Sequence, residues 1–345
     1  MAKQYSYRNK SDSFSMQVNI KTIIVFLVLL LVTLLVFMLC LSIGSDFIDP
    51  ITVIQHIFGM SAEQEFVINT LRLPRVLLGF MVGAALGVSG LILQGIIRNP
   101  LASPDIIGIT GGASVGAIIF IVSFMGAVNI QWLPFAALLG AGIVAIITYG
   151  LSWKNGVTPI RLVLIGIGIA AAMKAFTTLM IVLSDTYSTS AAYLWLTGSL
   201  YAAKWQDVLS MLPWLIIFIP LTFLFSNVVN AKELGDEVAT ALGVKVQLYR
   251  MMLLFISVAL AGSAVAFAGG IGFVGLIAPH IARMLVGRSF AGLILITAMI
   301  GGVIVMVADV VARTAFLPMD IPAGVFTSGI GAPFFIYLLY KNRNM

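Results

Sequence analysis

Residues 23–41 read I-I-V-F-L-V-L-L-L-V-T-L-L-V-F-M-L-C-L, a run of nineteen residues without a charged side chain. A helix needs about 20 apolar residues to cross roughly 30 Å of hydrocarbon, so this run is long enough to span a bilayer. It is longer than the apolar core of a signal peptide, and Leu39 before Cys40 is bulkier than lipoprotein processing accepts. The run therefore predicts a first transmembrane helix that stays in the protein.

Similar apolar runs recur along the rest of the chain, which is 61% hydrophobic and only 9% charged. So few charges cannot cover the surface of a soluble globule. Because no run alternates with period two, we expect helices rather than a transmembrane barrel. The net charge of +6 comes from Lys and Arg in loops, so no nucleic-acid partner is expected. The single cysteine gives no disulfide or thiol pair for a metal.

Hydropathy and helix breakers predict an all-α polytopic bundle of about ten spans. A polar tail at 1–20 precedes one transmembrane domain at 21–345. The even number of spans places both termini on the same side, which we take as the cytoplasm. Fourteen of the nineteen Lys and Arg residues then fall on the cytoplasmic side, as the positive-inside rule requires. The predicted spans are 21–43, 71–93, 108–127, 133–152, 160–184, 208–227, 250–268, 277–286, 291–312 and 322–340.

Small residues mark the second predicted span. Gly79, Gly83 and Gly87 repeat at intervals of four on one helix face. Glycine at this spacing lets two helix backbones approach closely in lipid. We therefore expect helix packing here and assign these glycines no chemistry.

Two segments interrupt the hydrophobic pattern. Residues 94–117 contain Pro100 and Pro104, and residues 268–287 contain Pro279 and His280. We expect both to be discontinuous, because irregular backbone near membrane depth is tolerated only inside protein or beside water. For residues 94–117 two alternatives stay open: the segment lines a cavity or a cytoplasmic mouth, or it forms a tight turn at the membrane surface. A lone His is more often structural than a ligand, and no metal site is expected. Candidate pathway or gate residues in these segments are Gln94, Asn99, Pro100, Pro279 and His280.

The longest polar interruption, at 230–246, lies on the predicted cytoplasmic side. Asp236 is a candidate N-cap and Glu237 suits the first turn, while Gly243 would end a helix of about two turns. Val238, Ala241 and Leu242 would share one apolar face. Such a helix either fills a groove on a partner or folds back on the bundle, and the residues alone leave both readings open.

Charges at unusual depths complete the pattern. Arg72, Arg75 and Arg313 fall on the predicted outer side, where they either dock a protein with acidic residues or reach toward lipid headgroups. Lys174 and Asp309 fall within spans, where each would cost a few kcal/mol facing lipid. Both should face protein or water, and pairing between them stays open. Lys174 is a further candidate pathway residue.

Several long motifs, in order, resemble the FecCD-type permease family of type II ABC importers, which includes the cobalamin permease. The resemblance covers nearly the whole chain after residue 20, and its departures, Ser103 and the pair Met319 and Asp320, are small. The motifs are R-L-P-R-V-L-L-G-F (72–80), Q-G-I-I-R-N-P-L-A-S-P (94–104), L-G-D-E-V-A-T-A-L-G-V (234–244), G-F-V-G-L-I-A-P-H-I-A-R (272–283), A-D-V-V-A-R (308–313) and I-P-A-G-V-F-T-S-G-I-G-A-P-F-F (321–335).

This resemblance implies a cobalamin-permease-like subunit of the bacterial inner membrane. It would pair with a second permease copy or paralogue, two ATPase subunits on the cytoplasmic face and an extracytoplasmic binding protein. It assigns coupling helices to about 230–249 and binding-protein docking to Arg72, Arg75 and Arg313. The implied ATPase-coupling residues are Leu234, Gly235, Asp236, Glu237, Val238, Ala241, Leu242 and Gly243.

The expected function is therefore a transporter subunit and not an enzyme. The chain lacks the G-x-x-x-x-G-K-[ST] motif, so ATP and Mg²⁺ are expected on a partner and no cofactor on this chain. Ferric siderophore is the first substrate expected, because siderophore systems are the most numerous in the family. Haem or cobalamin is the alternative within the family. An ion-coupled transporter using Lys174 and Asp309 is the alternative outside it.

Overall fold

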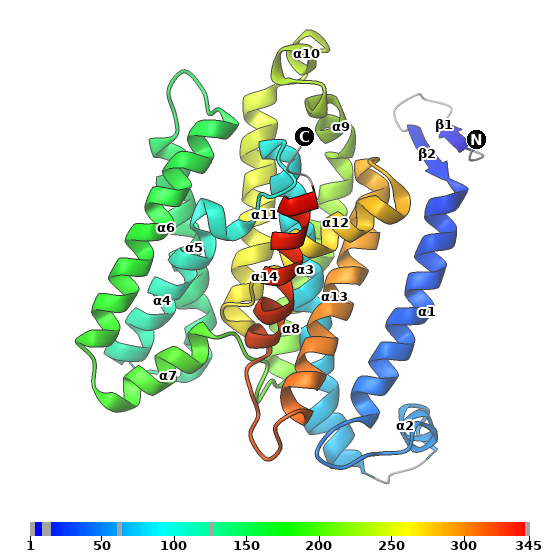
Figure 1. Cartoon of the computed structure of the whole chain (residues 1–345), viewed down its shortest axis with the longest axis vertical. Helices are drawn as coiled ribbons and strands as arrows, with labels where there is room; N and C mark the ends of the chain where they lie inside the picture. The colour runs from blue at the N-terminus through cyan, green and yellow to red at the C-terminus, as the bar shows by residue number, and fades with distance from the viewer. Residues whose placement is uncertain (1–3, 9–14, 61–63, 125–126, 342–345) are drawn as a thin grey trace.

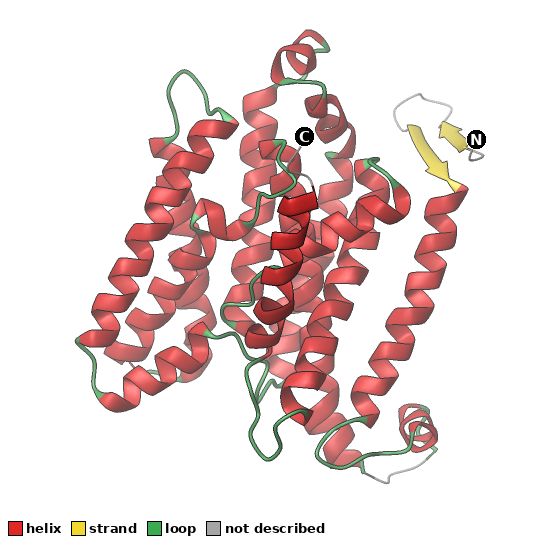
Figure 2. Cartoon of the chain, in the orientation of Figure 1, coloured by secondary structure: helices red, strands yellow, loops and turns green. Residues whose placement is uncertain are grey.

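The structure is a computed structural model that describes residues 4–8, 15–60, 64–124 and 127–341. Figures 1 and 2 show a bundle of helices with two strands at its N-terminal end. Strands β1 (Gln4–Arg8) and β2 (Ser15–Asn19) pair antiparallel just before the first helix. The polar composition of the predicted tail did not indicate this pair.

Seven helical segments of the described chain are long and apolar enough to cross a membrane. Two of them begin with a short η segment, η1 (Val67–Arg72) before α3 and η3 (Ile130–Trp132) before α5. The seven helices are α1 (Ile20–Ser42), α3 (Leu73–Ile97), α5 (Leu133–Leu151), α6 (Pro159–Val182), α8 (Trp205–Leu224), α11 (Val246–Ala268) and α13 (Phe290–Thr314).

Three shorter apolar helices occupy the other predicted spans: α4 (Ile109–Phe124), α12 (Val274–Val286) and α14 (Ala323–Lys341). The helical membrane fold is thus confirmed, while the number of ten spans stays a prediction. The remaining short elements lie at the ends of the bundle or in its breaks. They are α2 (Pro50–Ile57), η2 (Pro104–Ile107), α7 (Thr186–Leu196), α9 (Ser226–Glu233) and α10 (Asp236–Ala241).

The core of the bundle is built around α3. In its most apolar window 89% of the residues are buried, against 11% for α1 at the periphery. Glycine allows this burial, because Gly83 of α3 and Gly301 of α13 stand backbone to backbone: a Cβ on either would clash with the carbonyl oxygen of the other. The predicted close approach is therefore observed, with α13 as the neighbour.

Both predicted interruptions are present, but both are shorter than the predicted segments 94–117 and 268–287. The chain leaves helix between α3 and α4 and again at 269–273, where Gly269 has a φ of +68°. Pro279 and His280, however, lie inside the continuous α12. Pro279 has no N–H for the carbonyl of Gly275, and Gln94 Nε2 donates to that oxygen instead at 3.2 Å. This side chain explains why proline does not break α12.

The orientation of the elements agrees with an even number of spans. In Figure 1 the strands β1 and β2, the helix α10 and the last turns of α14 lie at one end of the bundle. The α2 helix and the loop between α13 and α14 lie at the opposite end. We call these the cytoplasmic and outer ends, following the positive-inside rule.

Candidate partner-docking site

The segment of α9 and α10 projects from the cytoplasmic end (Figure 1). Gly235 turns the chain between the two helices with a φ of +115°, and Gly243 follows α10 with a φ of +83°. The predicted N-cap is wrong by one residue, because Gly235 is the N-cap and Asp236 is the first helical residue. The predicted stop at Gly243 is confirmed, since the helix ends at Ala241 with Leu242 as its C-cap. Glycine supplies both turns because it adopts positive φ without strain.

An apolar stripe on this segment faces away from the bundle. Leu234 is 67% exposed, Val238 45% and Leu242 65%, and Ala241 beside them is also exposed. Ala239 is the residue of α10 that packs inward. A groove of about 930 Å³ runs beside the helix, lined by Glu237, Thr240, Lys245 and their neighbours. Of the two readings left open by the sequence, the exposed stripe favours docking over folding back.

Buried charges hold the base of α10. Asp236 Oδ2 accepts a hydrogen bond from Arg250 Nη2 at 2.5 Å, and the Arg250 side chain is completely buried. Arg250 Nη1 also donates to the carbonyl of Val157, between α5 and α6. The sequence marked Arg250 only as a cytoplasmic charge, because a pattern of residues does not show which arginine is internal.

Lys232 of α9 is the second buried cation near α10, 1% exposed. Within the described part of the chain its Nζ has no hydrogen-bond partner. Burial, followed by the neighbouring Arg250, lowers the pKa of Lys232 to about 8, while Asp236 raises it and Arg98 lowers it further. The base of the segment is therefore electrostatically strained.

A cavity of about 310 Å³ lies next to α9 at the cytoplasmic end. It brings together three predicted gate residues, Gln94, Asn99 and Pro100, with Glu233 and basic side chains. Gln94 is only 3% exposed, and its Oε1 accepts from Arg283. Gln94 therefore braces α3 against α12, while Asn99 and Pro100 are exposed. The basic side chains in the lining are Arg98, Arg283 and Arg288.

Pro279 and His280 have different surroundings although they are adjacent in sequence. Pro279 is buried in α12. The His280 ring meets Phe334 of α14 edge-on, with 5.9 Å between ring centroids, and the two share a small crevice with Pro100. Among the described residues no cluster of three metal-ligating side chains occurs, so His280 has no companions for a metal.

Lys174 stands apart from the other pathway candidates. It is exposed on α6, and within the described residues no ion pair involves it. The pairing with Asp309 left open above does not occur. Asp309 is 2% exposed and takes Arg75 as its partner instead, with Arg75 Nη2 and Asp309 Oδ1 at 2.8 Å. An exposed ammonium within a span needs water or another protein chain beside it.

The three outer arginines are held inside the protein. Arg75 also binds Asp320 at 2.6 Å, so one guanidinium joins α3, α13 and the loop before α14. Arg72 is 4% exposed and donates to the carbonyls of Leu41, Ser42 and Asp46. Arg313 donates to the carbonyl of Cys40. Docking through these arginines stays a prediction, and the burial of Arg72 and Arg75 argues against it.

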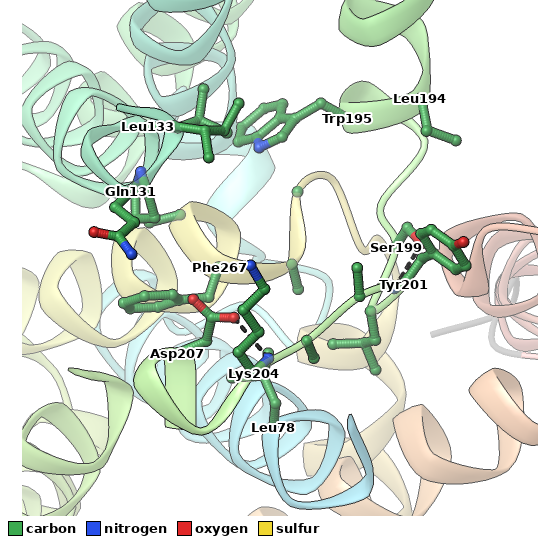
Figure 3. A pocket seen from close by; sticks show the side chains of 18 of the residues that line it. Leu78, Gln131, Leu133, Leu194, Trp195, Ser199, Tyr201, Lys204, Asp207 and Phe267 are labelled. Atoms are coloured by element: carbon green, nitrogen blue, oxygen red, sulfur yellow. Dashed lines mark hydrogen bonds between the residues drawn. The ribbon is translucent and has the colours of Figure 1, made fainter. Parts of the chain in front are cut away.

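The outer end has a cavity that the sequence did not indicate (Figure 3). Its volume is about 390 Å³, and its lining is mainly apolar, with Trp195, Phe267 and Leu78 among the walls. Lys204 and Asp207 stand at its polar part, where the Lys204 N–H donates to Asp207 Oδ2 at 2.9 Å. The lining residues come from segments far apart in sequence, so no local motif announces the cavity.

The chain is thus a helical membrane bundle with a projecting apolar segment and internal ion pairs, an arrangement that a permease requires for docking a partner. The chain belongs to the FecCD transport family, and the sequence pattern of that family matches residues 29–341. This membership confirms the predicted family and the prediction of a transport subunit rather than an enzyme.

Individual relatives are similar to this chain over nearly its full length. The chain is 46% identical to the achromobactin transport system permease protein of Dickeya dadantii, over 97% of this chain and 96% of that protein. It is 42% identical to the iron(3+)-hydroxamate import system permease protein of Bacillus subtilis, over 93% and 98% respectively. A solved metal-chelate type ABC transporter in an inward-facing conformation is similar with a TM-score of 0.82 and 31% identity, covering 93% of this chain and 99% of that one.

Proposed function

We propose that this chain is the permease subunit of a binding-protein-dependent ABC importer in a bacterial cytoplasmic membrane. The observation that carries the proposal is the exposed stripe of Leu234, Val238 and Leu242 on a segment fixed to the bundle by buried charges. A short apolar helix of this kind fits a groove on a partner. The partner proposed for it is an ATPase subunit, one on each of two permease halves.

The proposed substrate is a ferric siderophore. Support comes from relatives whose names specify achromobactin, iron(3+)-hydroxamate and Fe(3+)-citrate. A cobalamin import permease of Halobacterium salinarum is also 40% identical, over 82% of this chain and 75% of that protein. Because this match covers less of both proteins than the match to the achromobactin permease, haem or cobalamin is the weaker alternative.

The proposed mechanism is alternating access driven from outside the chain. Closure of two ATPase subunits around ATP and Mg²⁺ moves the α9–α10 segments, and a pathway between two permease halves changes the side to which it opens. This chain contributes the docking surface and one wall of the pathway, and it binds no cofactor itself. An extracytoplasmic binding protein delivers the substrate to the outer end.

The pathway wall is proposed to include Lys174, whose exposed ammonium needs a wet surface within the membrane. Asn99 and Pro100 at the cytoplasmic end are proposed gate residues. Pro279, His280 and Gln94 support this gate from behind, since Gln94 and Pro279 are buried and His280 packs on Phe334.

The test is uptake and ATP hydrolysis in liposomes that contain the permease, its ATPase and the cognate binding protein. We expect ATP hydrolysis that rises with loaded binding protein, and uptake that depends on ATP. Deletion of residues 236–243 should abolish both responses without removing the chain from the membrane. Normal coupling after the deletion would refute the proposal. Uptake that collapses with an ionophore at constant ATP would favour an ion-coupled transporter instead.

A further inference from the structure

We propose that Arg250 is the positioning residue that transmits movement of α10 to α11 and to the start of α6. The proposal rests on the proposed function, because it concerns how docking of an ATPase subunit reaches the pathway. Arg250 lies outside the exposed stripe and joins α10, α11 and the start of α6.

One guanidinium makes contacts in two directions. Arg250 lies in the second turn of α11, completely buried, with Nη2 at 2.5 Å from Asp236 Oδ2 on α10. Its other terminal nitrogen, Nη1, donates to the carbonyl of Val157. Val157 immediately precedes Thr158, the N-cap of α6. The arginine therefore holds the docking helix and the first turn of α6 at a fixed separation.

The chemistry of arginine suits this task. Its planar guanidinium presents several donors in a rigid fork, whereas the lysine ammonium is a point charge on a flexible stem. A lysine at 250 reaches one acceptor well and leaves the geometry of the second undefined. Because removing one partner of a buried ion pair strands the other charge, α10 cannot swing away from α11 without a large cost. The two elements should move together.

A second contact ties the loop to α11 without involving α10. Gln247 Oε1 accepts from the Val157 N–H at 3.0 Å, and Gln247 Nε2 donates to the Val157 carbonyl at 3.3 Å. The loop is thus fixed to α11 by two residues, and among the hydrogen-bonding side chains that the structure describes, Arg250 is the one that also binds Asp236 of α10. Removal of the arginine fork should separate the docking helix from the loop and leave the loop in place.

The consequence for transport follows from α6. This helix begins two residues after Val157 and carries Lys174 on its exposed surface. If α6 moves as a rigid body, a displacement of its first turn also displaces the part of the helix that carries Lys174. Arg250 thereby connects ATPase docking on the outside of the segment with the proposed pathway wall.

The experiment compares Arg250→Lys with the parent chain in reconstituted complexes. The quantities measured are recovery of the ATPase subunit with the permease, ATP hydrolysis, and substrate transported per ATP hydrolysed. We expect normal recovery and continued hydrolysis, with transport per ATP lowered about tenfold, which corresponds to about 1.4 kcal/mol of lost coupling. A merely structural role would lower uptake and hydrolysis in proportion and leave their ratio unchanged.

Arg161→Lys is the matched control. Arg161 of α6 also fixes this loop, donating to the carbonyls of Ser152, Lys154 and Gly156, and within the described residues no hydrogen bond or ion pair joins it to α10. We expect its transport per ATP to equal that of the parent. An equal loss in Arg161→Lys would overturn the inference, because it would trace the effect to loop order and not to the connection with α10.

Asp236→Asn gives an independent measurement from the other partner, with the advantage that Asp236 is partly exposed and tolerates change more easily. If the two residues act through each other, each single variant and the double variant should show the same loss, not a product of two losses. Independent losses, or an unchanged ratio in Arg250→Lys, would overturn the inference. Absence of ATP-dependent uptake by the parent complex would instead refute the proposed function.

Discussion

Arg75 shows how a single residue can organise one end of a membrane protein. Its guanidinium binds Asp309 within α13 and Asp320 in the loop before α14, and Asp309 is 2% exposed. Without it Asp320 would lose this partner, and Asp309 would keep only Arg313 among the described residues, whose Nε lies 4.0 Å from Asp309 Oδ2. A buried pair of this kind is weak support for overall stability but costly to break from one side.

We predict that Arg75→Met destabilises the protein by about 3–5 kcal/mol, because the buried Asp309 loses its hydrogen-bonded partner and is left with the 4.0 Å contact with Arg313. The measurement is thermal unfolding of the purified protein in detergent. Arg288→Met serves as the control, since Arg288 is exposed and its loss should change stability by less than about 0.5 kcal/mol. A double variant Arg75→Met with Asp309→Leu should recover part of the loss, and failure to do so would contradict the assigned pairing.

Lys232 makes stability depend on pH. Its pKa falls to about 8 in the folded chain from an ordinary value of 10.5. Between these values the unfolded chain binds more protons than the folded one, so stability rises as pH increases from about 8 to about 10.5 and is flat for this group below 8. We predict that Lys232→Met removes this rise, which amounts to about 3 kcal/mol at most. Unfolding midpoints across this pH range provide the test, and an unchanged slope in the variant would contradict it.

Individual residues were the level at which sequence reasoning was least complete. The polar segment at 230–246 showed its helix and its exposed stripe, because capping and periodicity are local properties. Arg250 and Asp320 were not assigned partners, and Lys174 and Asp309 were left as a pair that does not form. Arg75 and its two partners lie more than two hundred positions apart, whereas Arg250 and Asp236 are fourteen apart. In both cases the pairing depends on how the helices pack, which no local pattern encodes.

At the scale of elements, α10 presents the exposed apolar stripe of Val238 and Leu242. We predict that Val238→Asp and Leu242→Asp each lower recovery of the ATPase subunit with the permease by at least about tenfold, because a charge on the apolar stripe would be buried in the groove. Co-purification from membranes measures this.

Asn155→Asp is the control for these stripe variants, because it adds the same charge to an exposed position of the loop between α5 and α6. Its backbone is left-handed with a φ of +53°, a conformation that Asp tolerates. Recovery should remain at the parental level. Loss of the ATPase in this control would show that added charge alone disturbs assembly.

The α6 helix gives a prediction for the pathway. Lys174→Met should lower uptake severalfold while assembly and membrane insertion remain normal, and Lys174→Arg should restore most of the uptake, because the charge and not the shape is required. Transport by reconstituted complexes measures the effect. Unchanged uptake by Lys174→Met would remove Lys174 from the proposed pathway.

Element boundaries were predictable wherever glycine and proline acted locally. The break after Ile97 lies inside the predicted irregular segment 94–117, four residues beyond the predicted end of the span at 93. The end of α10 lies just before the predicted stop at Gly243. Pro279 was the exception, because the side chain of Gln94 on another helix satisfies the carbonyl that proline leaves free. A proline signal is therefore overruled when a neighbouring helix supplies the missing hydrogen bond.

For the whole molecule, the contact between α3 and α13 decides whether the bundle can close. We predict that Gly83→Ala destabilises the protein by about 1–3 kcal/mol or more, because the added Cβ meets the backbone of Gly301. Gly142→Ala in α5 is the matched control, since a Cβ there meets nothing within 4 Å. Thermal unfolding in detergent compares the two, and equal stability of both variants would contradict the close contact.

The contact of α3 with α13 has a mechanical consequence. Where α3 and α13 touch through glycine backbone, no layer of side chains separates them. We therefore expect the two helices to move together as one rigid unit. The ion pair of Arg75 with Asp309 fixes the outer end of this unit. Toward the cytoplasmic end, Gln94 connects α3 to α12. A displacement of α10 should therefore be taken up by helices outside this pair, among them the peripheral α6, whose start Arg250 joins to α10.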